Sequence, residues 1–347
     1  MRVVQMDEQR AEVGEPLRAD ADTGPSTGTP PSRRDSRFLA ALLLAPLVAA
    51  LALWAFAWPA ARTAPHDLPL GVAGPDAAVT QVEARLSAHK GAFELHRYSG
   101  EPAARAAIED RDVYGAVVVT EQGTTLLTAS AASPLVAQLL HQAVAQSGDV
   151  KTVDVVPAPA TDPRGAALTA SVLPLAMAGI AAGALVTLLN LTGRRAVASL
   201  LGSAALIGAV ATGIADGWLG VLTGNRWAEA GALSLAALAV SAAVAGLSAL
   251  IGRAGISIAA AVIMLLGNSF SAAASAPHML PAPAGTLGQW LPPGAGATLL
   301  RSVSFFDGAA TLTPALTLTW WAALGLGAVL LGSALKERKG REAASAH

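Results

Sequence analysis

The sequence contains no cysteine. It therefore excludes disulfides, thiolate catalysis, and zinc or iron–sulfur sites built on thiolates. Charged residues are also scarce, at 14% of 347 residues, whereas a soluble domain averages about 25%. This polar surface is too small to keep the whole chain in water. The net charge of −1 argues against nucleic acid as a partner, because phosphate binding needs a clustered cationic surface.

Long apolar runs take the place of the missing charge. A helix needs about 20 apolar residues to cross a bilayer, and six stretches qualify: 38–58, 167–191, 196–215, 227–251, 255–274 and 315–335. The sequence therefore predicts an α-helical polytopic membrane bundle of about six spans. Its expected parts are a first transmembrane helix at 37–60, a five-helix bundle at 166–336, and cytoplasmic tails at 1–36 and 337–347. The first tail is polar and is expected to be disordered.

Charge in the loops sets the expected orientation, because cytoplasmic loops of membrane proteins are enriched in Lys and Arg. With the N-terminus inside, the inner segments hold Arg33, Arg34, Arg37, Arg194, Arg195, Arg253, Lys336, Arg338, Lys339 and Arg341. The outer flanks and short outer loops hold Arg62, Arg164, Arg226 and Arg301. The tryptophans also fall near the expected outer interface, where an indole keeps its N–H wet. Both signals predict a multi-pass protein of a bacterial plasma membrane, with a cytoplasmic N-terminus and C-terminus.

Between their ends the six spans contain no Asp, Glu, Lys, Arg or His. Ion-coupled transporters place ionisable groups at membrane depth, so this absence argues against ion-driven transport. Asp216 and Glu229 lie at outer helix ends and are expected to be solvated boundary residues. Gly179 and Gly183 form a Gly-x-x-x-Gly motif, which predicts close helix packing inside the bundle and leaves a dimer face as the alternative.

Residues 63–164 alternate between strand and helix patterns and are expected outside the membrane. Strands are predicted at 68–73, 93–98, 113–120, 124–129 and 150–156, and helices at 76–88, 102–110 and 133–146. Ser133 followed by Pro134 is typical of a helix start. Strands that alternate with helices predict a small extracytoplasmic α/β domain. The apolar run 113–120 is expected at the centre of its sheet, paired with 124–129 as a hairpin.

This domain offers no catalytic motif. His66, His89, His96 and His141 have no ligand-like spacing, and the acidic residues are dispersed. The chain also has no nucleophile elbow, no metalloprotease helix and no Gly-x-x-x-x-Gly-Lys-Ser/Thr phosphate loop. We therefore expect no enzyme activity of its own, no metal and no cofactor.

The segment 272–313 is rich in Pro and Gly and yet strongly apolar. Apolar non-helical backbone near a membrane is tolerated when it packs in protein or lines a cavity. We interpret 277–291 as a structured, partly re-entrant element. We interpret 296–306 as a short interfacial amphipathic helix, with Arg301 pointing to lipid headgroups. The segment is either a packed cap over the bundle or an outer gate for a substrate.

Four short motifs resemble those of a known group of proteins. They are Leu266-Gly267-Asn268-Ser269-Phe270-Ser271, Pro277-His278-Met279-Leu280-Pro281, Trp290-Leu291-Pro292-Pro293-Gly294-Ala295 and Tyr114-Gly115-Ala116-Val117-Val118-Val119. With the order of one span, a large outer domain and five clustered spans, they resemble type-2 ABC transporter permeases of the phage-infection-protein-like branch. The resemblance points to a candidate translocation or outer-gate segment that contains Asn268, Pro277, Pro281, Pro292, Pro293 and Arg301.

The resemblance implies that the chain is the permease subunit of an ATP-driven exporter of a hydrophobic or envelope-related compound. A separate ABC ATPase would supply the energy, and the permease would form a homo- or heterodimer in the lipid bilayer. The inner turns at 193–195 and 252–254 are very short, which favours an alternative: a non-transporting cell-envelope protein whose outer domain binds a partner. An intramembrane enzyme is a third hypothesis, for which Ser171, Asn190 and Asn268 are the polar candidates.

Overall fold

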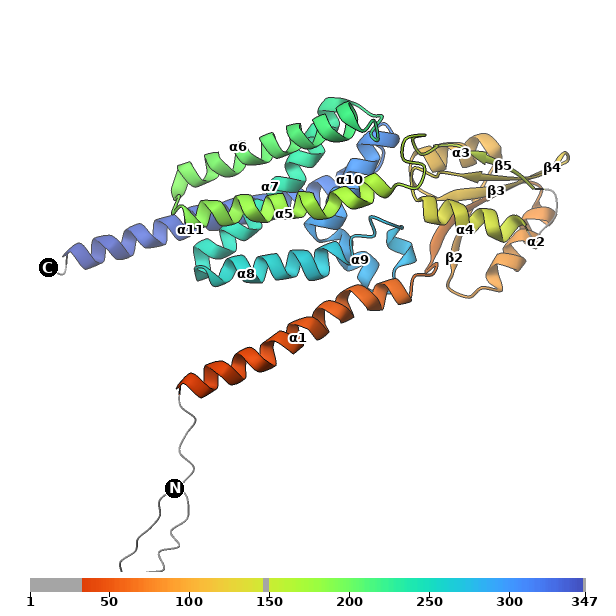
Figure 1. Ribbon diagram of the computed structural model, residues 1–347. Coiled ribbons are helices and arrows are strands. Elements are labelled where there is room, and N and C mark those ends of the chain that lie inside the picture. Colours follow the sequence, from red (N-terminus) through yellow and green to blue (C-terminus); the bar gives the residue numbers. More distant parts are fainter. Residues whose placement is uncertain (1–32, 146–149, 346–347) are drawn as a thin grey trace, which may run out of the picture. The chain divides into compact units, whose positions relative to one another are not determined.

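The computed structural model of the chain describes residues 33–145 and 150–345 (Figure 1). The disordered tail expected at 1–36 therefore lies outside the described residues, apart from 33–36, which begin helix α1 (Arg33–Ala61). Contacts divide the chain into two compact units, 1–48 and 49–347. The boundary falls inside α1, and the tertiary contacts discussed below lie within 49–347.

A five-stranded sheet forms the centre of the α/β region, which we define as residues 68–154. Its strands are β1 (Leu68–Ala73), β2 (Phe93–Tyr98), β3 (Gly115–Thr120), β4 (Gly123–Thr128) and β5 (Val150–Asp154). Their order is β2-β1-β3-β4-β5. β1 runs parallel to β2 and β3, β4 runs parallel to β5, and β3 and β4 form an antiparallel hairpin. The central position of β3 and its hairpin partner are confirmed.

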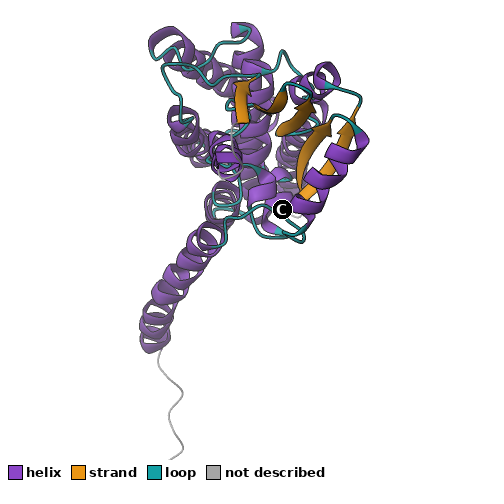
Figure 2. Cartoon of the chain, turned by 90° about the vertical axis from the view of Figure 1, so that its right-hand side faces the viewer, coloured by secondary structure: helices purple, strands orange, loops and turns teal. Residues whose placement is uncertain are grey.

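Helices cover both faces of this sheet (Figure 2): α2 (Asp76–Ser87), α3 (Glu101–Glu109) and α4 (Pro134–Ala145). α3 packs on one face through Ile108, while α2 and α4 pack on the other through Val79 and Leu140. Successive strand residues point to opposite sides of the sheet. Because β1 and β3 are apolar at almost every position, they supply apolar side chains to both faces. The Ser133 hydroxyl accepts the Val136 N–H at 3.3 Å, which confirms the predicted start of α4.

Among the described residues, five helices are long and apolar enough to span a membrane, which supports a multi-pass membrane protein. They are α1, α5 (Ala166–Leu188), α6 (Gly193–Thr212) with its π-helical continuation η1 (Gly213–Trp218), α7 (Arg226–Ile251) and α11 (Leu312–Ser345). α7 is the central helix. More than half of its apolar stretch is buried, and α5, α6 and α11 all pack against it.

The Gly-x-x-x-Gly motif lies where α5 crosses α7. A Cβ atom on Gly179 would meet the Val240 side chain at 2.8 Å, and one on Gly183 would meet the Ser241 carbonyl oxygen at 2.4 Å. Any larger residue would therefore push the two backbones apart. The motif is used for packing inside the bundle, as its small residues predict.

The full-length span expected at 255–274 is not confirmed. The helix consists of α8 (Ala254–Ala261) and the π-helical η2 (Val262–Asn268), with 8 and 7 residues. At a rise of 1.5 Å per residue it is about 22 Å long, shorter than the roughly 30 Å of a bilayer core. The chain leaves the helix after Asn268, and Ala272 adopts a left-handed conformation with φ of 56°. Residues 269–274 are apolar enough to be predicted as part of a membrane-spanning helix, but they form a turn.

The segment that follows enters the core of the α/β region at two places. It contains η3 (Pro277–Met279), α9 (Ala284–Gln289) and α10 (Pro292–Phe305), so the structured element and the helix expected there are present. Met279 packs with the side chains of β1 and α4, and Phe306 packs with those of α3 and β3. These contacts explain why the sheet and the bundle belong to one compact unit.

Candidate binding cleft

A large apolar cleft of about 580 Å³ lies between α5 and α6. α7 and α10 close its inner side with one leucine each, Leu233 and Leu300. Its lining comprises Ala167, Leu168, Ala170, Ser171, Pro174, Leu175 and Ala178 of α5, Leu206, Ile207, Val210 and Ala211 of α6, Ile214 and Ala215 of η1, and Leu219, Val221 and Leu222 of the following loop. Leu206 and Val210 are 68% and 61% exposed, so the cleft opens sideways along the apolar surface of the bundle.

Both walls of the cleft contain a break in regular α-helix. Pro174 lies inside α5 and has no backbone N–H, so the carbonyl of Ala170 loses its helical donor. The opposite wall passes from α6 into the π-helix η1, which contributes Ile214 and Ala215. π-Helical turns are rare and occur frequently at functional sites. Irregular backbone is therefore present in both walls of the cleft.

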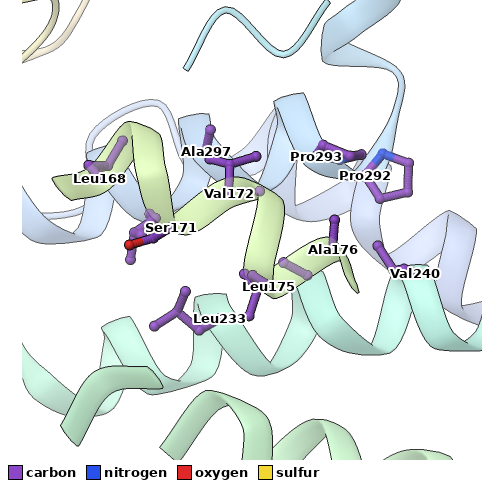
Figure 3. A pocket seen from close by; sticks show the side chains of 13 residues that line it. Leu168, Ser171, Val172, Leu175, Ala176, Leu233, Val240, Pro292, Pro293 and Ala297 are labelled. Atoms are coloured by element: carbon purple, nitrogen blue, oxygen red, sulfur yellow. The ribbon is translucent and has the colours of Figure 1, made fainter. Parts of the chain in front are cut away.

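A second, smaller cavity of about 30 Å³ lies between α5, α7 and α10. Figure 3 shows Leu168, Ser171, Val172, Leu175 and Ala176 of α5 beside Pro292, Pro293 and Ala297 of α10 and Leu233 and Val240 of α7. Leu168, Ser171 and Leu175 line both cavities, so the two spaces adjoin at the α5 wall. Pro292 and Pro293, predicted as gate residues, therefore border the cavity that continues the cleft.

Among the described residues that line the cleft, Ser171 alone has a polar side chain. Its hydroxyl donates to the Ala167 carbonyl oxygen at 2.7 Å, so the hydroxyl proton is already used within α5. A hydroxyl oxygen that donates in this way still has lone pairs to accept with. The polar groups of the cleft are thus acceptors.

α10 connects the cleft to the α/β region. Its Ala297 and Leu300 face the two cavities. Arg111, in the turn before β3, donates from Nη1 to the Thr298 carbonyl oxygen at 3.2 Å and to the Ser302 hydroxyl at 2.6 Å. The Arg111 guanidinium also lies 5.0 Å from the centre of the Phe306 ring. Burial lowers the pKa of Arg111.

Arg301 does not point to lipid headgroups, so this prediction is wrong. The residue is 5% exposed, and its Nη2 donates to the Ala273 carbonyl oxygen at 3.0 Å. The Thr169 hydroxyl lies 3.1 Å from the same oxygen and 2.8 Å from the Gly165 carbonyl oxygen, which brings the start of α5 next to this contact. Arg301 is enclosed because the 269–276 turn folds over α10, an arrangement that an amphipathic pattern does not predict. Within residues 33–145 and 150–345, neither Arg301 nor Arg111 forms a salt bridge.

Glu229 is also placed wrongly by the sequence, because it is fully buried and not a solvated boundary residue. Its Oε1 accepts the Gly224 N–H at 3.0 Å. The loop that carries Gly224 folds over the start of α7, and the Thr223 hydroxyl donates to the Ser304 carbonyl oxygen of α10 at 3.1 Å. The loop therefore shields Glu229 from solvent. Asp216 accepts a hydrogen bond from Arg226 at 2.6 Å near the surface.

Tyr114 and His278 form a contact that sequence reasoning missed. The His278 Nδ1 lies 3.4 Å from the Tyr114 hydroxyl, and the two rings meet edge to face. Burial raises the pKa of Tyr114 and lowers that of His278. Both residues occur within the four motifs quoted above, but 164 positions separate them. Residues this far apart in the sequence leave no local pattern from which their contact could be predicted.

The remaining predicted gate residues do not line the cleft. Asn268 ends η2, directly after Gly267, which packs against Pro293. Pro277 begins η3 beside the α/β region, and the Pro281 carbonyl oxygen accepts the Ala284 N–H at 2.8 Å in front of α9. The structure thus brings Pro292 and Pro293 to the smaller cavity and places the others elsewhere in the same stretch of chain.

The part of the chain that the structure describes contains no group of three His, Cys, Asp or Glu that could hold a metal ion. Comparison of the chain with protein-family models, with curated proteins and with solved structures finds no match. The resemblance to type-2 permeases therefore stays a prediction.

Proposed function

We propose that this chain is the membrane subunit of an exporter that takes a hydrophobic, lipid-like molecule into the cleft between α5 and α6. The observation that carries the proposal is the cleft itself. Its volume of about 580 Å³ falls within the range of roughly 300–1,000 Å³ of small-molecule sites. Its exposed rim of Leu206 and Val210 favours entry from the bilayer rather than from water.

The proposal includes six crossings, with the α/β region outside and both termini in the cytoplasm. α8 and η2 supply the additional crossing. Gly255 packs at Leu247, near the end of α7, while Gly267 packs at Pro293, at the start of α10. Ile263 of η2 packs with Val240 and Val244, so this short helix follows the second half of α7. The buried turn at 269–276 completes the crossing, since non-helical backbone is tolerated at membrane depth when protein surrounds it.

A separate ATPase supplies the energy in this proposal. The inner connections offer it little surface, because α5 ends at Leu188 and α6 begins at Gly193, and only two residues separate α7 from α8. α11 is the better contact. Its 34 residues extend over about 51 Å, well beyond a bilayer core, and its last turns contain Lys336, Glu337 and Arg338.

The short inner connections also favour a second candidate, a non-transporting cell-envelope protein whose α/β region binds a partner. In that case Arg111 and Phe306 would transmit partner binding to α10 without any transport. The two candidates differ in what they require. Export requires an ATPase and an open cleft, whereas the envelope role requires neither.

The test is complementation of a strain that lacks the gene, with hydrophobic compounds quantified in cells and medium by mass spectrometry. Ala211 lines the cleft, so Ala211→Trp fills it, whereas Ala205→Trp adds the same bulk on the exposed face of α6. We expect Ala205→Trp to restore export and Ala211→Trp to fail, with both variants inserted equally in the membrane. An ABC ATPase should co-purify with both. Full export by Ala211→Trp would overturn the cleft as the route, and purification without any ATPase would leave the envelope role.

A further inference from the structure

The polar groups of the cleft wall are hydrogen-bond acceptors. Ala170, Ser171 and Pro174 follow one another along the α5 wall, and all three are exposed to the cleft. The Ala170 carbonyl lacks a helical donor because Pro174 has no N–H. The Ser171 oxygen retains lone pairs, because its proton is given to Ala167. Both residues line the cleft, so its α5 wall offers two neighbouring acceptors and no side-chain donor.

In a water-filled site these acceptors would bind water. Here the surrounding lining is aliphatic, and the rim residues Leu206 and Val210 open towards the apolar surface. An acceptor in hydrocarbon without a donor is costly, since no water is there to satisfy it. A ligand that carries an O–H or N–H group removes this cost, and an alkane or ester chain does not.

The same lining disfavours anions. None of the cleft residues named above carries a cationic side chain, and Ser171 has no free proton to donate. Two buried arginines lie at α10, but both already have partners: Arg301 of α10 donates to the Ala273 carbonyl oxygen, and Arg111 donates to Thr298 and Ser302 of α10. A phosphate or carboxylate in the cleft would lose its hydration without gaining donors.

We propose that the cleft binds an uncharged amphiphile, such as a long-chain or polycyclic alcohol, whose hydroxyl donates its single proton to either of these acceptors, the Ala170 carbonyl oxygen or the Ser171 hydroxyl oxygen. This inference rests on the proposed function only in taking the cleft as the ligand site. Pro174 acts as a positioning residue, because it keeps the carbonyl of Ala170 free for the ligand.

The test uses photo-crosslinking of the full chain in nanodiscs with three diazirine probes of equal chain length: a fatty alcohol, its methyl ether and the corresponding fatty acid. Crosslinks to the α6 wall at Leu206 and Ile207 are quantified by peptide mass spectrometry. We expect the alcohol to label this wall about tenfold more than the ether, which corresponds to about 1.4 kcal/mol for the lost hydrogen bond. The acid should label no better than the ether at neutral pH.

Two variants separate the hydrogen bond from the shape of the cleft. Pro174→Ala restores the N–H that bonds the Ala170 carbonyl within the helix, and Ser171→Ala removes the second acceptor. Each should lower alcohol labelling towards the ether level and leave ether labelling unchanged. Ser203→Ala is the matched control, because this α6 serine lies outside the cleft lining and donates to the Leu200 carbonyl.

The outcomes distinguish the two proposals. Equal labelling of the wall by alcohol and ether, unchanged in Pro174→Ala, would overturn the donor requirement and leave the cleft as a ligand site. Stronger labelling by the acid would overturn the exclusion of anions. If no probe labels the cleft wall above the lipid-exposed face at Ala205, the ligand site fails, and with it the proposed function.

Discussion

The packing of α5 on α7 gives the sharpest test of the bundle. A methyl group added at Gly183 would lie 2.4 Å from the Ser241 carbonyl oxygen and 2.8 Å from the Val244 Cβ. Real Cβ atoms do not approach backbone this closely, and a carbonyl inside a helix cannot rotate away. The two helices would have to separate by several tenths of an ångström, and the lost contact surface would extend along the whole crossing.

Overpacking of a well-packed core costs about 1–3 kcal/mol. We expect the cost of Gly183→Ala at the upper end of this range, because the added methyl group would clash with a backbone atom. Lipid offers no hydrophobic drive to restore the contact, since helices in a bilayer associate through close packing. Gly202→Ala is the matched control, because nothing lies within 4 Å of a Cβ at that position. Alanine is also the better helix former, by about 0.5–1 kcal/mol, so Gly202→Ala should be neutral or stabilising.

The assay is thermal unfolding of the purified chain in one detergent, followed by tryptophan fluorescence and by the fraction that remains monodisperse after heating. Gly183→Ala should unfold at a lower temperature than the wild type, and Gly202→Ala at the same or a higher one. If Gly183→Ala were as stable as Gly202→Ala, the α5–α7 contact would not be as close as described. The position of α5, which forms one wall of the cleft, would then be wrong.

Three further outcomes are expected. Asp162 accepts two N–H groups of the first turn of α5, at 2.7 and 2.9 Å, so Asp162→Ala should lower the free energy of unfolding by about 0.5–2 kcal/mol while Asp162→Asn retains most of it. Arg111→Met should destabilise the chain by about 2 kcal/mol through its lost charged hydrogen bonds and speed amide exchange in α10. The same change at Arg105, which pairs with Glu101 near the surface, should cost less than about 0.5 kcal/mol. Burial lowers the pKa of His278 below its ordinary value of 6.5, so below that pH the unfolded chain binds a proton that the folded chain does not. The stability provided by neutral His278 is complete above pH 6.5 and is lost as the pH falls towards the lowered pKa. In a stability profile from pH 8 to 5, His278→Gln should flatten this decline, and an unchanged slope would contradict the burial of the ring.

Local sequence patterns were sufficient to predict most of the helices and strands. The strands at 68–73 and 93–98 occur with the predicted bounds, because alternating or continuous apolar residues distinguish a strand from a helix within a few positions. The start of α4 was readable because Ser133 and Pro134 act on adjacent backbone groups. The long apolar helices were recognisable because crossing a bilayer imposes a minimum length.

The predictions from sequence fail where an apolar or charged residue could lie in several different environments. Residues 269–274 have the composition of a span and form a turn, and Arg301 has the place of an interfacial residue and is buried against the Ala273 carbonyl. Glu229 is buried because a loop from the preceding helix covers it. In each case the deciding contact comes from a distant part of the chain.

The sequence by itself determined that this chain has long apolar helices and a small α/β sheet, because hydrophobic period and length act locally. It also excluded cysteine chemistry, since that requires only an inventory of residue types. The tertiary structure decided which apolar side chains face each other and which line an open cleft, since Ala211 and Ala205 are indistinguishable in sequence. It also decided that Ala170, Ser171 and Pro174 of α5 line this cleft. A proline removes the helical donor of a carbonyl wherever it occurs, but the open space beside this one exists because of the position of α6.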